Sequence, residues 1–144
     1  MTRKEIIEST IRSALSQCFN AFMYSAENAG RLLSWFTSCD WWDDARDNKN
    51  YSDPRYKSFL GFMPKDIAVE VYDVAGRSAL NLAVKANCYF EIDDFLFNYQ
   101  ATWSRDGFAL ELVFIDRLTT QKEVPGYDHL PEDIPELVLA RLRH

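Results

Sequence analysis

The chain has few of the residues that usually mark cofactor, metal and disulfide sites. It contains five glycines, three cysteines and two histidines in 144 residues. The glycines are isolated from one another, so neither a phosphate-binding loop nor a dinucleotide fingerprint can be built from them. The cysteines are odd in number, far apart and without Cys-x-x-Cys spacing, which disfavours a disulfide framework or a zinc site. We therefore expect free thiols, no cofactor and no metal.

Histidine-based catalysis has little to draw on. His144 is terminal, so such catalysis would rest on His129, which could in principle form a thiolate and base pair with Cys39, with a nearby Asp such as Asp128 to orient the histidine. Nothing in the sequence brings these residues together. The sequence therefore favours a protein that is not an enzyme.

Basic residues are outnumbered by acidic ones. Sixteen Lys and Arg stand against 22 Asp and Glu, which gives a formal net charge of −6. This charge repels phosphate backbones and anionic membranes but allows a basic protein partner. The longest uncharged stretch, residues 13–26, is too short and polar to span a bilayer, and the charged start does not resemble a secretory signal. We expect a cytoplasmic protein that binds neither nucleic acid nor membrane directly.

Hydrophobic periodicity predicts helices at the start of the chain. Because 47% of the residues are hydrophobic and spread over the whole length, we expect one globular domain, residues 1–144. Thr2 and Glu5 have the spacing of a capping box. An apolar stripe at three- and four-residue intervals follows, formed by Ile7, Ile11, Ala14, Leu15, Cys18, Phe19 and Phe22. We expect a break near residues 24–28, then a second helical stripe over 32–36, with one bent helix as the alternative.

Asp53 and Pro54 predict a short helix over residues 54–60, which Gly61 would close. A last helix is expected over residues 135–143, with Glu136 in its first turn and basic residues in its last, as the helix dipole favours.

After Pro64 the hydrophobic period changes from 3.6 to 2, which indicates β-strands. Alternating runs occupy residues 67–72, 80–87, 95–103 and 108–114. The alanines of the second run leave a helix over 78–85 as the alternative. The order of elements predicts an α+β fold: N-terminal helices, an antiparallel sheet of about four strands with one apolar face covered by helices, and a C-terminal helix.

A hairpin turn separates the last two predicted strands. With Asp106-Gly107 as a two-residue loop, Trp103 would lie opposite Leu110 and Tyr99 opposite Phe114, all on one face. A four-residue loop would keep the same parity, so the sheet is expected to bury one face whichever turn forms.

The segment between Cys39 and Asp53 is the least regular and combines aromatic side chains with carboxylates. Adjacent tryptophans diverge in a helix or a strand, so both cannot easily be buried at one site. Aromatic anchors among carboxylates are typical of a surface that binds a basic protein. The predicted partner-binding residues are Asp40, Trp41, Trp42, Asp43, Asp44, Asp47, Tyr51 and Tyr56. The alternative is that both indoles close the core beneath a loop.

Asp43, Asp44 and Asp47 also have the Asp-Asp-x-x-Asp spacing with which isoprenyl diphosphate synthases bind magnesium. Those enzymes are all-helical and carry a second aspartate-rich site that this chain lacks. We interpret the match as a coincidence of composition.

These observations favour a small acidic cytoplasmic protein that occludes a basic, nucleic-acid-handling protein, as inhibitors and immunity proteins do. A homodimer formed through the amphipathic first helix is a further option. The alternative is a cone-like domain that binds or converts a small molecule. Its pocket on the sheet would be lined by Phe95, Phe97, Tyr99, Trp103, Leu110 and Phe114, with a carboxylate or His129 at the mouth.

Overall fold

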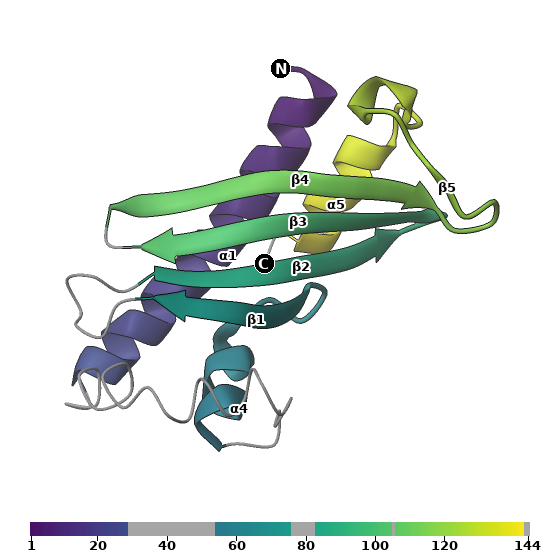
Figure 1. Cartoon of the computed structure of the whole chain (residues 1–144). Helices are drawn as coiled ribbons and strands as arrows, with labels where there is room; N and C mark the ends of the chain where they lie inside the picture. The colour runs from purple at the N-terminus through teal and green to yellow at the C-terminus, as the bar shows by residue number, and fades with distance from the viewer. Residues whose placement is uncertain (29–53, 76–82, 105, 143–144) are drawn as a thin grey trace.

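An antiparallel sheet with helices on one face makes up the described part of the chain (Figure 1). The structure, a computed structural model, describes residues 1–28, 54–75, 83–104 and 106–142. The elements are α1 (Arg3–Asn28), α4 (Pro54–Phe62), β1 (Ala68–Ala75), β2 (Ala83–Ile92), β3 (Phe95–Ser104), β4 (Gly107–Arg117), β5 (Lys122–Glu123), the 3-10 turn η1 (Tyr127–His129) and α5 (Ile134–Leu142). The predicted α+β fold, with an N-terminal helix, an antiparallel sheet and a C-terminal helix, is confirmed.

Helix α1 begins at the predicted cap, where the Glu5 backbone N–H donates to Thr2 Oγ1 at 3.1 Å. It continues to Asn28, the last residue of the range in which the break is expected. Residues 29–53 lie outside the described part of the chain, so the choice between a break and one bent helix stays a prediction. The second stripe expected over residues 32–36 lies outside the described residues.

The other helices start close to where the sequence places them. Helix α4 starts at Pro54 but continues to Phe62, so Gly61 lies inside it and does not close it. Helix α5 covers residues 134–142. Figure 1 shows α1 and α5 on the same side of the sheet. Helix α1 packs against both α5 and α4, and α5 also contacts β2.

The strands follow one another in the order β1-β2-β3-β4-β5, and every neighbouring pair is antiparallel. Strand β2 begins at Ala83, so residues 83–85 are not helical and the alternative helix over 78–85 is wrong for these three residues. Residues 78–82 lie outside the described part of the chain. In β2 the even-numbered residues are buried, and in β3 the odd-numbered ones. These residues form the face covered by the helices, which we call the covered face.

The hairpin between β3 and β4 differs from the expected one. Ser104 pairs with Gly107, so Gly107 belongs to β4 and the predicted Asp106-Gly107 loop is wrong. The φ angle of Gly107 is +142°, a conformation that only glycine adopts readily, and this explains a glycine at the first position of the strand. Trp103 therefore lies opposite Phe108, and not opposite Leu110. The shift is even, so the sides of the sheet are unchanged.

A β-bulge in β4 then reverses which side of the sheet the odd- and even-numbered residues of this strand face. Tyr99 pairs with Leu112 but Asn98 pairs with Phe114, which leaves Val113 as an extra residue. As a result Ile115 reaches the covered face, where it is 1% exposed. Phe114 lies on the opposite face, which corrects its predicted place opposite Tyr99. A similar shift of register in β1 lies at Tyr72.

The core between α1 and the covered face is largely aromatic. The ring of Trp103 stacks on Phe19 with centroids 5.3 Å apart, and its Nε1 donates to the Leu15 carbonyl at 3.3 Å. Phe22 meets Phe59 of α4 edge to face at 5.1 Å. Such ring pairs contribute about 0.5–1.5 kcal/mol each beyond the apolar area they bury. They fix α1 and α4 against the same end of the sheet.

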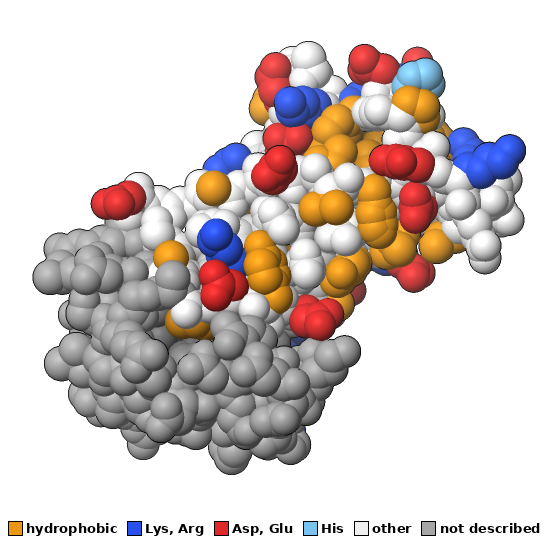
Figure 2. Space-filling view, in the orientation of Figure 1, with side chains coloured by type: hydrophobic (Ala, Val, Ile, Leu, Met, Phe, Trp, Pro, Cys, Tyr) orange, Lys and Arg blue, Asp and Glu red, His pale blue; other side chains and the backbone are white. Residues whose placement is uncertain are grey.

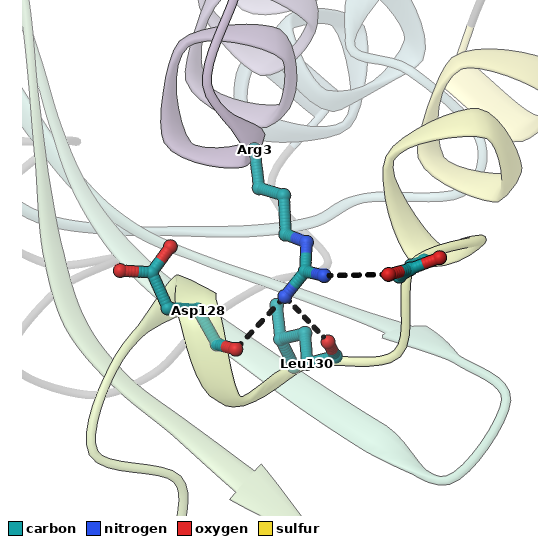
Figure 3. A network of polar contacts seen from close by, with 4 residues as sticks. Arg3, Asp128 and Leu130 are labelled. Carbon is teal, nitrogen blue, oxygen red and sulfur yellow. Dashed lines mark hydrogen bonds and ion pairs between the residues drawn. The ribbon is translucent and has the colours of Figure 1, made fainter.

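Polar contacts of two α1 side chains, Glu8 and Arg3, hold the start of the helix at the other end of the sheet. The Tyr99 and Tyr127 hydroxyls lie 2.7 Å apart, and Tyr127 donates to Glu8 Oε2 at 2.9 Å. Burial and this chain of neighbours raise the pKa of Tyr99 far above its usual range. Figure 3 shows Arg3, which donates to the carbonyls of Asp128 at 2.8 Å and Leu130 at 2.9 Å.

Removing the Tyr127 hydroxyl tests the buried chain. Tyr127→Phe leaves the Tyr99 hydroxyl, on a residue that is 0% exposed, without an acceptor, which costs about 1–3 kcal/mol of unfolding free energy. Tyr99→Phe is expected to cost less, because Tyr127 keeps its bond to Glu8. The double variant should be no less stable than Tyr127→Phe alone. Urea denaturation measures all three, with the exposed Tyr24→Phe as control; equal effects of Tyr127→Phe and the control would contradict this account.

Deletion of Val113 tests the bulge. Without Val113, Leu112 and Phe114 become consecutive and every other residue of β4 keeps its partner on β3. We expect a folded chain with cooperative unfolding. Deletion of Gln100 in β3 is the control, because it moves Trp103 to the other face and should abolish folding. Circular dichroism and thermal melts distinguish the two; unfolding of both variants would show that the bulge is required for the fold.

Candidate functional site

Most of the predicted partner-binding segment lies outside the described residues. This applies to Asp40, Trp41, Trp42, Asp43, Asp44, Asp47 and Tyr51. Tyr56 lies in α4. The predicted roles of all eight residues stay predictions, as does the alternative that the two indoles close the core.

The aromatic pocket of the alternative hypothesis is not where we expected it. Phe95, Phe97, Tyr99 and Trp103 are each at most 2% exposed and belong to the core beneath the helices. Leu110 packs against that core, and Phe114 lies on the opposite face. His129 is exposed in η1. All of the chosen lining except Phe114 therefore belongs to the core or packs against it.

The opposite face of the sheet, which we call the open face, has none of the described helices over it (Figure 1). Its side chains fall into rows that run across the strands. The central row is Ala68, Tyr89, Asn98 and Phe114. One flanking row is Glu70, Asn87, Gln100 and Glu111, and the other is Glu91, Leu96, Asp116 and Glu123.

Asn98, in the middle of the central row, is unusual for a residue on a face that no described helix covers. It is only 7% exposed, and its Oδ1 is buried without a hydrogen-bond partner among the described residues. Tyr89 and Phe114, both half-buried, flank it on the neighbouring strands. A buried amide oxygen without a donor costs about 1–3 kcal/mol. The Oδ1 atom of Asn98 therefore lowers the stability of the fold unless a donor reaches it, and Asn98 is a candidate site residue for that reason.

Carboxylates dominate the rows on either side. The two flanking rows hold Glu70, Glu91, Glu111, Asp116 and Glu123, and none of their described members is basic. Lys85 lies one row further out, paired in register with Asp73. The pKa of Tyr72 is raised first by burial and then by the carboxylates of Asp73 and Glu111, as expected where the potential is negative. Figure 2 shows this face, with hydrophobic side chains over the strands and Asp and Glu side chains among them.

The described residues form neither a metal site nor a reactive cysteine. No three His, Cys, Asp or Glu side chains among them are placed to hold a metal ion. Cys18 and Cys88 are free thiols, and burial raises the pKa of both, to about 12 for Cys88, which makes neither a ready nucleophile. Cys39 lies outside the described residues, so its proposed pairing with His129 has no geometry.

None of the described helices has both the length and the apolar character needed to cross a bilayer.

No protein family, curated protein or solved structure matches the chain. The function therefore has to be argued from the chemistry of the site.

The sequence reasoning missed the open face because it followed the apolar side of each strand. Tyr89 shares its face of β2 with the polar residues Asn87 and Glu91, and so gives a weak signal on its own. Its neighbours Asn98 and Phe114 join it only through the register of three strands and the bulge at Val113. No periodicity in the sequence carries that information.

Replacing Asn98 with leucine tests whether its amide is unsatisfied. Asn98→Leu removes the partnerless oxygen and keeps a similar size, so the unfolding free energy should rise by about 1 kcal/mol. Asn87→Leu, on the adjacent strand and half-buried, is the matched control and should change stability by less. Chemical denaturation measures both. A loss of stability at Asn98→Leu beyond the control would mean that the amide is satisfied in solution.

Proposed function

We propose that this protein binds a basic protein partner through its open face and thereby blocks the surface that it covers. The observation that carries the proposal is the row of Tyr89, Asn98 and Phe114 between two rows whose only charged members are carboxylates. Aromatic side chains at the centre of a patch with a charged rim are the usual anatomy of a protein interface.

The dimensions of the face support a protein partner. Strands of ten residues such as β2 and β3 are about 33 Å long, and four strands are about 19 Å wide. Their product, about 600 Å², approaches the roughly 800 Å² that each partner buries in a standard interface. The face is thus large enough for a specific complex and much larger than a small ligand needs.

The charge of the face selects the kind of partner. Carboxylates in both flanking rows raise the association rate of a positively charged protein and repel nucleic acid and anionic lipid. A protein that covers a basic surface prevents nucleic acid from reaching it. An inhibitor or immunity-type role against a nucleic-acid-handling protein follows from the proposal. A cytoplasmic location belongs to it as well, because the free thiols Cys18 and Cys88 suit a reducing compartment.

The predicted segment from Asp40 to Tyr56 has the same chemistry, aromatic rings among carboxylates. We propose that it adds to the same recognition. Charge reversal at Asp43, Asp44 and Asp47 measures its share separately from that of the open face.

Charge reversal on the open face tests the proposal. The chain is used as bait in a lysate of its own host, and the captured protein is purified and titrated against it. The triple variant Glu91→Lys, Glu111→Lys and Asp116→Lys should weaken binding at least about tenfold, and salt should weaken binding of the unchanged chain. Calorimetry at two ionic strengths measures both effects.

The matched control reverses three exposed carboxylates elsewhere, at Asp128, Asp133 and Glu136. It changes the net charge by the same amount but leaves the open face intact, so affinity should fall by much less. Equal affinities of the two triple variants would show that net charge alone drives binding. Failure to capture any partner in stoichiometric amount would count against the proposed function.

A further inference from the structure

We infer that the open face recognises an arginine side chain of its partner, whose guanidinium donates to Asn98 Oδ1 between Tyr89 and Phe114. This inference rests on the proposed function and adds to it the identity of the group that is read. The geometry behind it is the central row, in which the buried oxygen without a donor has an aromatic residue on each side.

The oxygen of Asn98 requires a donor. An amide oxygen accepts hydrogen bonds and cannot donate, so only an N–H or O–H group satisfies it. Oδ1 is buried, so in this proposal the donor of the partner reaches it by displacing neighbouring side chains, and Tyr89 and Phe114 are its neighbours on the adjacent strands. Both are only partly buried, so they have more room to change rotamer than the core side chains of the covered face. A partner without a donor at this point would leave the amide unsatisfied, which makes the site selective.

The two aromatic residues favour a flat donor. Tyr89 and Phe114 lie on the strands on either side of β3, so their backbones are about 10 Å apart. A guanidinium is planar and weakly hydrated, and it stacks on aromatic faces. A lysine ammonium is compact and strongly hydrated, and loses more solvation in the same place. Arginine is therefore expected to bind more tightly than lysine.

Carboxylates lie within reach of the remaining guanidinium N–H groups. Glu91 and Asp116 are two residues along from Tyr89 and Phe114 on the same face, and are thus diagonal neighbours of Asn98. Arginine has five N–H donors, more than one amide oxygen can use. The site thus offers one neutral acceptor at its centre and negative charge on its rim, which together match a guanidinium.

The test compares two peptides of equal charge, fluorescently labelled hexa-arginine and hexa-lysine, by fluorescence anisotropy with the full chain. We expect hexa-arginine to bind about tenfold more tightly, because the charge-assisted hydrogen bond and the stacking are specific to the guanidinium. Asn98→Leu should remove this preference and leave hexa-lysine affinity unchanged.

Two further variants distinguish the loss of the Asn98 Oδ1 acceptor from changes in the packing of the row. Asn98→Ala opens the row where Asn98→Leu fills it, so loss of the preference in both shows that the missing acceptor is the cause. Asn87→Leu is the control in the adjacent row and should keep the preference. Circular dichroism establishes that each variant is folded.

The outcomes distinguish this inference from the proposed function. Equal, salt-sensitive binding of both peptides that the Glu91, Glu111 and Asp116 reversals weaken would overturn arginine recognition and leave the proposed function standing. A preference that survives both Asn98 variants would also overturn the inference. If neither peptide binds, the inference is wrong, and the proposed function is then judged by capture of its partner.

Discussion

A sheet has two faces, and the described helices of this chain cover only one. Helix α1 lies along the covered face, held near its middle by the bond from the Trp103 indole to the Leu15 carbonyl and near its start by the bond from Tyr127 to Glu8. The buried side chains of β2 and β3 face these helices. The other face of an antiparallel sheet usually meets water and is polar. Here it carries aromatic side chains and the unpartnered Oδ1 of Asn98, and the proposed function rests on that departure.

The bulge at Val113 links the core to the open face. Because of the extra residue, Ile115 completes the core and Phe114 points away from it. Phe114 then completes the row in which Tyr89 and Asn98 lie. Sites that bind often break a local rule of stability, and Asn98 does so by burying an oxygen without a donor. One inserted residue therefore serves both the packing of the protein and the surface proposed to bind.

The sequence could predict what depends on local chemistry. The cap at Thr2, the start of α4 at Pro54 and the alternation of β3 are each set by a few neighbouring residues. It could not predict the register of β3 and β4, because two loop positions give the same parity, nor the bulge, which no periodicity marks. Whether the helical stripe breaks after Asn28, where α1 ends, stays a prediction, because the residues that follow are not described. The central row depends on the register of three strands and on the bulge, and so could not be predicted from the sequence.

The central claim is that the open face makes the contact. It is tested most directly by nuclear magnetic resonance of the isotope-labelled chain, titrated with hexa-arginine. The account predicts that the largest changes fall on the side-chain amide of Asn98 and on the backbone amides of Tyr89 and Phe114, while those of α1 and α5 stay in place. Largest changes on α1 and α5, with the Asn98 amide unmoved, would contradict it.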